Sequence, residues 1–360
     1  MSGDVAVVLG TRPEAIKLFV LVELLGARAR VIHTGQHFDS ALAAGVADDL
    51  SLRDPDVQLR LGGIGRGAQI GQATDALSSL FAADRPGVVI VQGDTNSGLA
   101  GALAANAAEV PLLHVEAGLR SHDRAMPEEH NRVVIDHLAD LCAAPTELAA
   151  KHLADEGIHS ERVVVTGNTV VEAVLRMLPG APRRAELRAM HGVDDGDYVV
   201  ATLHRPENVD EEGALREALE GLRAVEETVL FPMHPRTAAR VEEFGLRDLV
   251  TGLRVVPPLL PSDFLGLAHD AALLVSDSGG IQEEASVLKR PVLVVRRSSE
   301  RPEALGTFAE LIGPAEIGER AAWHRTGPGS TRDLTAVPSP FGDGTASQQI
   351  ADLARTLAAG

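Results

Sequence analysis

Residues 272–285 read ALLVSDSGGIQEEA, and this stretch predicts a strand, a tight turn and the start of a helix. The apolar run ends at Ser276, a Ser-Gly-Gly turn follows, and Glu283 and Glu284 fall in the first turns of the helix. The amino end of a helix offers unpaired backbone N–H groups and a partial positive charge, and glycines let a phosphate approach the backbone. The stretch is therefore either a phosphate-binding turn or a capped helix whose acids complement its dipole.

Short runs rich in β-branched residues alternate with helical segments along the whole chain. They cover residues 5–9, 29–34, 87–92, 111–116, 162–167, 198–203, 228–234, 253–258, 272–277 and 291–296. Continuous apolar strands with helices between them are typical of parallel sheets covered on both faces. The sequence therefore predicts an α/β fold.

The length of 360 residues suggests about two domains, and a candidate linker lies near the middle of the chain. A helix there ends in a Pro-Gly-Ala-Pro segment, residues 179–182. We expect two doubly wound domains, residues 1–168 and 169–345. The last helix, within residues 346–360, is expected to pack back towards the first domain.

The composition is that of a globular protein, with 45% hydrophobic and 23% charged residues and no apolar segment long enough to span a bilayer. The N-terminus lacks the pattern of a signal peptide, and a single cysteine, Cys142, agrees with a reducing compartment. We expect a cytoplasmic protein without a membrane insertion. Its formal net charge of −18 repels nucleic acid, so we expect no nucleic-acid partner.

Polar residues follow seven of the predicted strands. In open parallel sheets, ligands bind beyond the carboxyl ends of the strands. Charge at one strand end is common, whereas charge at seven indicates a site. The stretches are residues 10–14, 35–37, 93–95, 116–118, 203–205, 234–236 and 277–280.

The first of these strand ends offers two basic residues. Arg12 lies at the mouth of a helix that begins with Pro13, where it could clamp a phosphate, and Lys17 could reach the same region. The alternative is a surface arginine and a solvated lysine. No GxGxxG follows this strand, which argues against a dinucleotide cofactor and hydride transfer.

Three carboxylates in the first half are candidates for proton transfer. Asp94 and Glu116 follow neighbouring strands, and Glu128 begins the helix after Pro127. Like charge at adjacent strand ends would influence their ionisation. For Asp94, with Thr95 beside it, the alternative role is a helix N-cap.

In the second half, histidine and arginine occur together after two successive strands. His204 is followed by Arg205, and His234 by Arg236, which favours binding of an anion. Metal ligation is the competing use of histidine, but no HExxH or other tight ligand spacing is present. We therefore predict no catalytic metal.

Taken together, the motifs resemble those of the non-hydrolysing UDP-N-acetylglucosamine 2-epimerases. They occur in the family's order, and the resemblance extends from about residue 5 to residue 350. One such motif is a weak signal, but the whole series is highly specific. The motifs are GTRPEAIK (10–17), TGQH (34–37), QGDT (92–95), HVEAGLRS (114–121), MPEEHNR (126–132), TGNTV (166–170), LHRPEN (203–208), DSGGIQEEA (277–285), ERPEAL (300–305) and PFGDG (340–344).

The resemblance implies a glycosyltransferase-B type fold, with two Rossmann-like domains facing a cleft. It implies that Ser278, Gly279 and Gly280 cradle a diphosphate, that Glu283 holds the ribose, and that Phe264 packs on uracil. It also assigns catalytic and binding roles to further residues. The catalytic set is Asp94, Glu116, Glu128 and His204, and the remaining substrate-binding residues are Arg12, Lys17, His37, Arg205, His234 and Arg301.

The implied reaction is reversible epimerisation of a UDP-sugar at C2, without a cofactor. UDP is eliminated to leave 2-acetamidoglucal, and it adds back after C2 is protonated on the opposite face. We also expect a homodimer. Pro206 stands where many bacterial members carry an arginine, which puts their substrate-activation site in doubt here. The alternatives are a hydrolysing 2-epimerase, a glycosyltransferase of the same fold, and a nucleotide-sugar sensor without catalysis.

Overall fold

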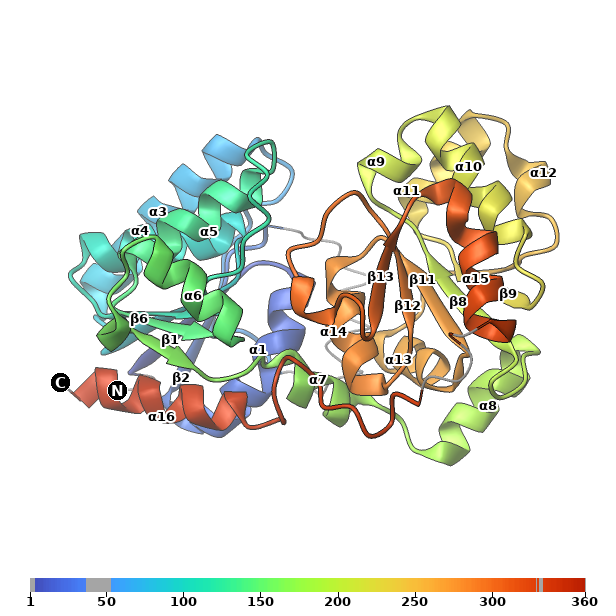
Figure 1. The fold of residues 1–360 in the computed structure, drawn as a ribbon. Coiled ribbons are helices and arrows are strands. Elements are labelled where there is room, and N and C mark those ends of the chain that lie inside the picture. Colours follow the sequence, from blue (N-terminus) through green and yellow to red (C-terminus); the bar gives the residue numbers. More distant parts are fainter. Residues whose placement is uncertain (1–3, 37–52, 328, 330–332, 360) are drawn as a thin grey trace. The chain divides into compact units, whose positions relative to one another are not determined.

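The computed structural model of the chain describes residues 4–36, 53–327, 329 and 333–359 (Figure 1). The chain divides into two compact units, each built around its own parallel sheet. Unit 1 comprises Met1–Leu175 and Phe341–Gly360, and unit 2 comprises Arg176–Pro340. The position predicted for His37 lies outside the described residues.

The division falls inside helix α7 (Val170–Met177), between the domain boundary expected at residues 168 and 169 and the candidate linker at residues 179–182. The start of α7 belongs to unit 1 because the Glu172 carboxylate accepts a hydrogen bond from the backbone N of Ser347, at 2.6 Å. Ser347 lies at the start of the last helix, α16 (Ala346–Ala359), which packs against the first helix, α1 (Arg12–Leu25).

Unit 1 contains a sheet with strand order β3-β2-β1-β4-β5-β6-β7, and every pairing is parallel. Val5 at the start of β1 lies opposite both Ala29 of β2 and Val88 of β4. The strands are β1 (Val5–Leu9), β2 (Ala29–His33), β3 (Val57–Gln58), β4 (Val88–Gln92), β5 (Leu112–Val115), β6 (Leu141–Ala144) and β7 (Val163–Val165). The other helices of unit 1 are α3 (Arg66–Ala83), α4 (Asn96–Ala107), α5 (Pro127–Leu138) and α6 (Glu147–Asp155), and short 3₁₀ turns are Gly26–Arg28 and Ser160–Arg162.

Helices cover both faces of this sheet, which explains why its strands are continuously apolar. Successive side chains of β1 point to opposite faces. Val7 packs in one core with Leu21 of α1 and Ile350 of α16, whereas Val8 packs in the other core with Phe81 of α3. Figure 1 shows α1 and α16 running together along one side of the unit.

Unit 2 contains a second parallel sheet, with strand order β10-β9-β8-β11-β12-β13. Its strands are β8 (Tyr198–Thr202), β9 (Thr228–Pro232), β10 (Arg254–Val256), β11 (Leu273–Ser276), β12 (Val292–Val295) and β13 (Ala309–Ile312). Its helices are α8 (Ala181–His191), α9 (Pro206–Val209), α10 (Glu212–Arg223), α11 (Pro235–Glu243), α12 (Arg247–Val250), α13 (Pro261–Asp270), α14 (Gly279–Leu288) and α15 (Ile317–Thr326), with 3₁₀ turns at Pro302–Ala304 and Pro314–Glu316. The α/β prediction is confirmed in both units.

Each sheet has one point where the direction of strand order reverses. In unit 1 the chain builds β2 and β3 on one side of β1 and then returns to place β4 on the other, and unit 2 repeats this with β8 and β11. Connections leave in opposite directions beyond the carboxyl ends of these strands, which is where doubly wound folds bind ligands. A ligand site is therefore expected beyond the carboxyl ends of β1 and β4 in unit 1, and of β8 and β11 in unit 2.

The strands that the sequence did not reveal are very short or lack a continuous β-branched run. β6 reads LCAA and lacks a β-branched residue, β13 contains Glu310, and β3 has two residues. Among the described helices, none is long and apolar enough to cross a membrane.

The turn after β5 depends on glycine at 118, where φ is 83° and a Cβ atom would lie 2.3 Å from the carbonyl oxygen of Ala149. We predict that Gly118→Ala lowers the free energy of unfolding of unit 1 because it combines left-handed strain with this clash. The matched control is Gly157→Ala, since Gly157 has φ of 84° and no atom within 4 Å of a Cβ atom.

Gly157→Ala should lower the free energy of unfolding by about 1–2 kcal/mol, because of backbone strain alone. Gly118→Ala should lower the free energy of unfolding by a further ~1–3 kcal/mol, because of the clash with Ala149. Urea denaturation of both variants measures the difference, and equal losses would contradict the role given to the clash.

Candidate active site

Glu116 lies directly after β5 with φ of 65°, in the left-handed region that non-glycine residues rarely adopt. Its Oε2 atom is 2.6 Å from Lys17 Nζ and accepts hydrogen bonds from Gln92 Nε2 at 2.9 Å and Asn168 Nδ2 at 3.4 Å. The side chains of Lys17 and Glu116 are 10% and 6% exposed. Such a pairing favours the charged carboxylate, and the strained backbone is of the kind that clusters at functional sites.

Lys17 is therefore not the solvated lysine that the sequence left as an alternative. It is buried on α1 and joins the first helix to the end of β5. Arg12, at the start of the same helix, is exposed.

Asp94 follows β4 and is paired with Arg132 of α5. Arg132 Nη2 donates to Asp94 Oδ2, and Asn131 Nδ2 donates to the Asp94 backbone carbonyl at 2.8 Å. The arginine side chain is 4% exposed, whereas that of Asp94 is 30% exposed. Asp94 is thus a partly exposed carboxyl group, held by Arg132, at the carboxyl end of β4. Thr95, rather than Asp94, caps α4, since its side chain accepts from Gly98 N.

Of the two glutamates that begin α5, Glu128 is exposed and Glu129 is buried. Glu129 accepts hydrogen bonds from Ser121 N at 3.0 Å and His122 N at 2.9 Å, and it lies 3.1 Å from Arg132. Burial acts against its charged form, but these donors and Arg132 outweigh burial and lower the pKa of Glu129. Glu129 therefore holds the loop after β5, and Glu128 is the glutamate that solvent and solutes can reach.

Glu14 is a buried carboxyl group that the sequence analysis did not single out as a site residue. It accepts from Gly10 N at 3.0 Å, Thr11 N at 2.8 Å and Thr95 Oγ1 at 2.7 Å, so it ties the turn after β1 to the turn after β4. Burial raises its pKa to about 7, with these hydrogen bonds opposing the rise. The signal in the sequence was the Thr-x-x-Glu capping pattern at residues 11–14.

In unit 2, the buried Asp277 organises the switch point between β8 and β11. Its carboxylate accepts hydrogen bonds from His204 N at 2.9 Å, Arg205 N at 2.8 Å and Asn208 Nδ2 at 3.2 Å. Burial opposes its charge, but His204 and the backbone N–H groups lower the pKa of Asp277. Its motif position was quoted in the sequence, yet no role was assigned to it.

His204 is held by the same carboxylate, with Nδ1 at 3.0 Å from Asp277 Oδ1 and the side chain 39% exposed. Its other ring nitrogen, Nε2, lies on the side of the ring away from Asp277. The His234 ring is 5.5 Å away, centroid to centroid, and His234 Nδ1 accepts from Arg236 N at 3.1 Å. Arg236 itself turns away, because its guanidinium pairs with Asp210.

The turn after β11 leads into α14, and the contacts of its residues are not those of a helix end that is merely capped. Ser278 stands at the N-cap position without a side-chain capping hydrogen bond. Glu283 is fully buried and pairs with Arg301 Nε at 2.6 Å. A Cβ atom at 279 would lie 3.1 Å from Arg301 Nη1, so glycine there lets the guanidinium lie against the first turn of the helix.

Arg301 is one of several cations around a second buried acid, Glu300. Glu300 accepts from Arg296 Nη1 at 2.7 Å and lies 3.5 Å from Arg301 Nη1 and 3.9 Å from Arg205 Nη2. Burial opposes ionisation, but the charges of Arg301 and Arg296 lower the pKa of Glu300 to about 2. The amino end of α14 thus carries a helix dipole and a firmly positioned arginine, both of which favour an anion. Phe264 is half-buried on α13, which packs against α14.

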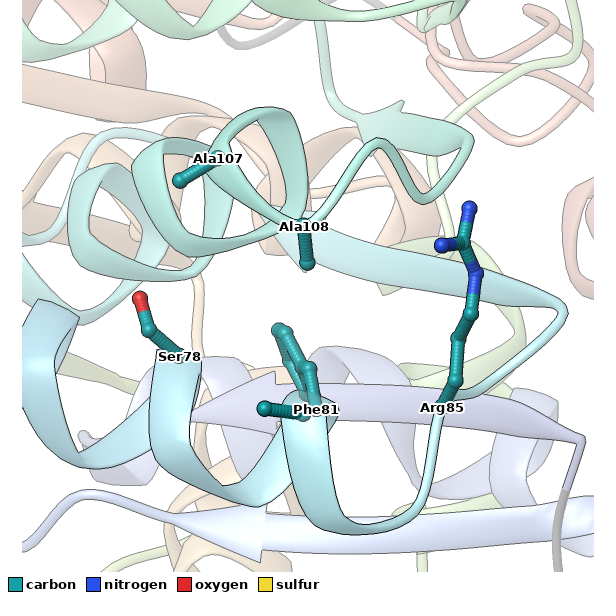
Figure 2. A pocket seen from close by; sticks show the side chains of 6 residues that line it. Ser78, Phe81, Arg85, Ala107 and Ala108 are labelled. Carbon is teal, nitrogen blue, oxygen red and sulfur yellow. The ribbon is translucent and has the colours of Figure 1, made fainter.

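Two cavities lie elsewhere in the units. One of about 320 Å³ is lined by Ser78, Phe81 and Arg85 and by Ala107 and Ala108, near the start of β4 (Figure 2). Another of about 580 Å³ lies near the starts of β8 and β9. Both are at the amino ends of strands, and none of the predicted site residues lines them. Among the described residues, no group of three or more His, Cys, Asp and Glu side chains is arranged to hold a metal ion.

Two doubly wound units with charged residues at the strand-reversal points are the architecture of glycosyltransferase-B-like enzymes. A family model described as UDP-N-acetylglucosamine 2-epimerase matches residues 24–355, a span that includes most of both units. The chain belongs to this family of isomerases.

Relatives agree with that assignment. A UDP-N-acetylglucosamine 2-epimerase of Methanocaldococcus jannaschii is 39% identical over 319 residues, covering 85% of this chain and 87% of that protein. A UDP-2,3-diacetamido-2,3-dideoxy-D-glucuronate 2-epimerase of Pseudomonas aeruginosa is 33% identical, covering 96% and 97%. The structure of S. aureus MnaA with UDP has a TM-score of 0.87 at 31% identity, covering 99% of this chain and 96% of that one.

The raised pKa of Glu14 predicts a pH-dependent stability of unit 1. In the unfolded chain Glu14 loses its proton near 4.5, whereas in the folded protein it does so at about 7. The folded state therefore binds more protons between these values, and its free energy of unfolding should fall by about 3 kcal/mol as the pH rises through them. Glu14→Gln should remove this slope.

Hydrogen exchange of the slowest amides in β1 and β4, followed from pH 5 to pH 8, measures this free energy for unit 1. The matched control is Glu23→Gln, on the exposed side of α1. A slope of the same size in Glu14→Gln would show that another group causes it, and a wild type without a slope would show that the pKa of Glu14 is not raised.

Proposed function

We propose that this protein interconverts UDP-N-acetylglucosamine and UDP-N-acetylmannosamine by inverting C2, without net hydrolysis. The observation that supports this most strongly is family membership over both units, together with relatives named for 2-epimerisation of UDP-sugars. The proposal accounts for the presence of an anion-binding site in unit 2 and of a group of carboxyl side chains in unit 1. It requires an anion-binding helix for the nucleotide and a set of acids and bases for the sugar.

The nucleotide is proposed to bind at the amino end of α14. Ser278, Gly279 and Gly280 offer backbone N–H groups to the diphosphate, and Arg301 lies beside them. Glu283 is proposed to accept hydrogen bonds from the ribose, with Phe264 against uracil. The pair between Glu283 and Arg301 supports this assignment, because it fixes the orientation of a buried carboxyl group.

Further contacts are proposed for basic side chains at other strand ends. His204 and His234 lie close together after β8 and β9, where Nε2 of His204 can donate to an oxygen of the departing diphosphate. Arg205 is proposed to contribute to the same anion site. Arg12 and His37 are proposed as further substrate contacts.

The proton at C2 is proposed to move through the carboxylates of unit 1. This proton is not beside a carbonyl carbon, so its direct removal is too costly, and the C1–O bond to UDP must break first or at the same time. Asp94 and Glu116 stand at neighbouring strand ends, each paired with a buried basic side chain, Arg132 and Lys17. With Glu128 they offer acid and base groups for removing the proton from one face and returning one to the other.

Lys17 is proposed to hold Glu116 in place and to limit its basicity, since an ammonium at 2.6 Å stabilises the carboxylate. Homodimer formation and a cytoplasmic location, expected from the sequence, stay predictions.

The reaction in deuterated water tests the proposal. Elimination and readdition must place solvent deuterium at C2, so UDP-N-acetylglucosamine should give both epimers with deuterium at that carbon, and free UDP should not accumulate. Proton and phosphorus NMR of one reaction mixture measure both outcomes. Accumulation of UDP with free N-acetylmannosamine would identify a hydrolysing enzyme instead, and epimer without deuterium at C2 would rule out the glycal route.

A crossed pair of variants separates chemistry from binding. Glu116→Gln keeps the shape of the side chain but removes its charge, so kcat should fall roughly 10²-fold or more while UDP affinity stays the same. Glu283→Gln should weaken UDP binding by about 1–3 kcal/mol, because it removes the charge that orients Arg301 and accepts from the ribose.

Calorimetric titration with UDP and initial rates measure the two effects. Glu284→Gln, on the same helix as Glu283, is the control for binding and should match the wild type. Loss of UDP affinity in Glu116→Gln, or full activity there, would contradict the division of roles.

A further inference from the structure

His114 of β5 is fully buried, and both of its ring nitrogens face an acceptor. Nδ1 is 2.7 Å from Asp136 Oδ1, and Nε2 is 2.8 Å from the backbone carbonyl oxygen of Gly93. A carbonyl oxygen can only accept, so Nε2 must carry a proton. The protonation of Nδ1 then depends on the state of Asp136.

Asp136 is a carboxylate because its other oxygen also meets only donors. Oδ2 accepts from Gly118 N at 3.2 Å and lies 2.7 Å from Arg120 Nη2. Burial acts against the charge, yet His114 and Arg120 together lower the pKa of Asp136. At 2.7 Å a proton must lie between Nδ1 and Oδ1, and the Arg120 guanidinium on Oδ2 favours the carboxylate form of Asp136, so this proton belongs to Nδ1 and His114 donates from both nitrogens as an imidazolium.

A fourth group completes the balance of charge. Arg120 forms two further hydrogen bonds with Glu156, from Nε at 2.7 Å and from Nη2 at 2.6 Å. The cluster thus holds two cations, His114 and Arg120, and two anions, Asp136 and Glu156. Buried charges persist when they are paired in this way, and removing one member leaves its partner uncompensated.

The cluster touches both turns that carry the proposed catalytic carboxylates. The Gly93 carbonyl that His114 binds immediately precedes Asp94, and the Gly118 N–H that Asp136 binds lies two residues after Glu116. We propose that His114 is a positioning residue, held as an imidazolium, that fixes the turn of Asp94 relative to the turn of Glu116. It does not touch substrate, since it has no exposed surface.

The catalytic part of this inference rests on the proposed function, whereas the protonation state does not. In wild-type protein labelled with ¹⁵N-histidine, His114 should show protons on both ring nitrogens at pH 8, where an exposed histidine is neutral. His114→Gln assigns the signals by their disappearance. A single ring N–H for His114 would overturn the proposal whatever the enzyme's activity.

Positioning is tested by comparing His114→Gln with His137→Gln, an exposed histidine on α5 next to Asp136. In His114→Gln, kcat should fall about 10²-fold because a small displacement of catalytic groups has that effect, and UDP affinity should be unchanged. Backbone amide signals of residues 93–95 and 116–118 should shift. His137→Gln should match the wild type in all three measurements.

A folded His114→Gln protein with unshifted amides in these turns, or with wild-type kcat, would overturn the positioning role. If the wild type itself shows no epimerase activity, the proposed function fails, and the amide shifts still decide whether His114 positions the two turns.

Discussion

Charge that is buried must be compensated, and this constraint governs how the chain arranges the ends of its strands. Glu116 is held by Lys17, Glu283 by Arg301, and the carboxylate of Asp277 by backbone N–H groups and His204. Each is removed from water beside an apolar sheet, where an isolated carboxylate would be neutralised or would unfold its surroundings. These partners offset the cost of burial and also fix the orientation of the carboxyl groups, because each partner contributes a directed hydrogen bond.

The two units use the same topological device for different purposes. In each, strands are added first on one side of a central strand and then on the other, so that loops diverge at β1/β4 and at β8/β11. Unit 1 places acids at and beside its reversal point, and two of them, Asp94 and Glu116, pair with the cations Arg132 and Lys17. Unit 2 places histidines and a glycine-bearing helix end there, backed by the cluster of Glu300, Arg296 and Arg301. The carboxyl groups of unit 1 and the anion-binding groups of unit 2 are thus supported by two separate hydrophobic cores.

Several motif residues serve the site without facing it. Glu14, His114 and Asp136 contact residues next to Asp94 and Glu116, and burial raises the pKa of Glu14 to about 7. Within the motif HVEAGLRS, His114 contacts the Gly93 carbonyl next to Asp94, and Glu116 pairs with Lys17. Under the proposed function, this motif combines a reactive residue, Glu116, with a residue that positions it, His114.

The amino-acid sequence by itself determined the α/β class, most of the strands and the stretches that carry the site, because apolar runs and the polar residues after them are local patterns. It did not reveal β6 or β13, whose side chains are less typical of strands. It also left open whether Lys17 was solvated and whether Glu283 merely complemented a helix dipole. Those questions depend on partners far along the chain, Glu116 for Lys17 and Arg301 for Glu283, and on burial that only packing creates. Tertiary structure decided them because the state of a charged group is set by what surrounds it in space.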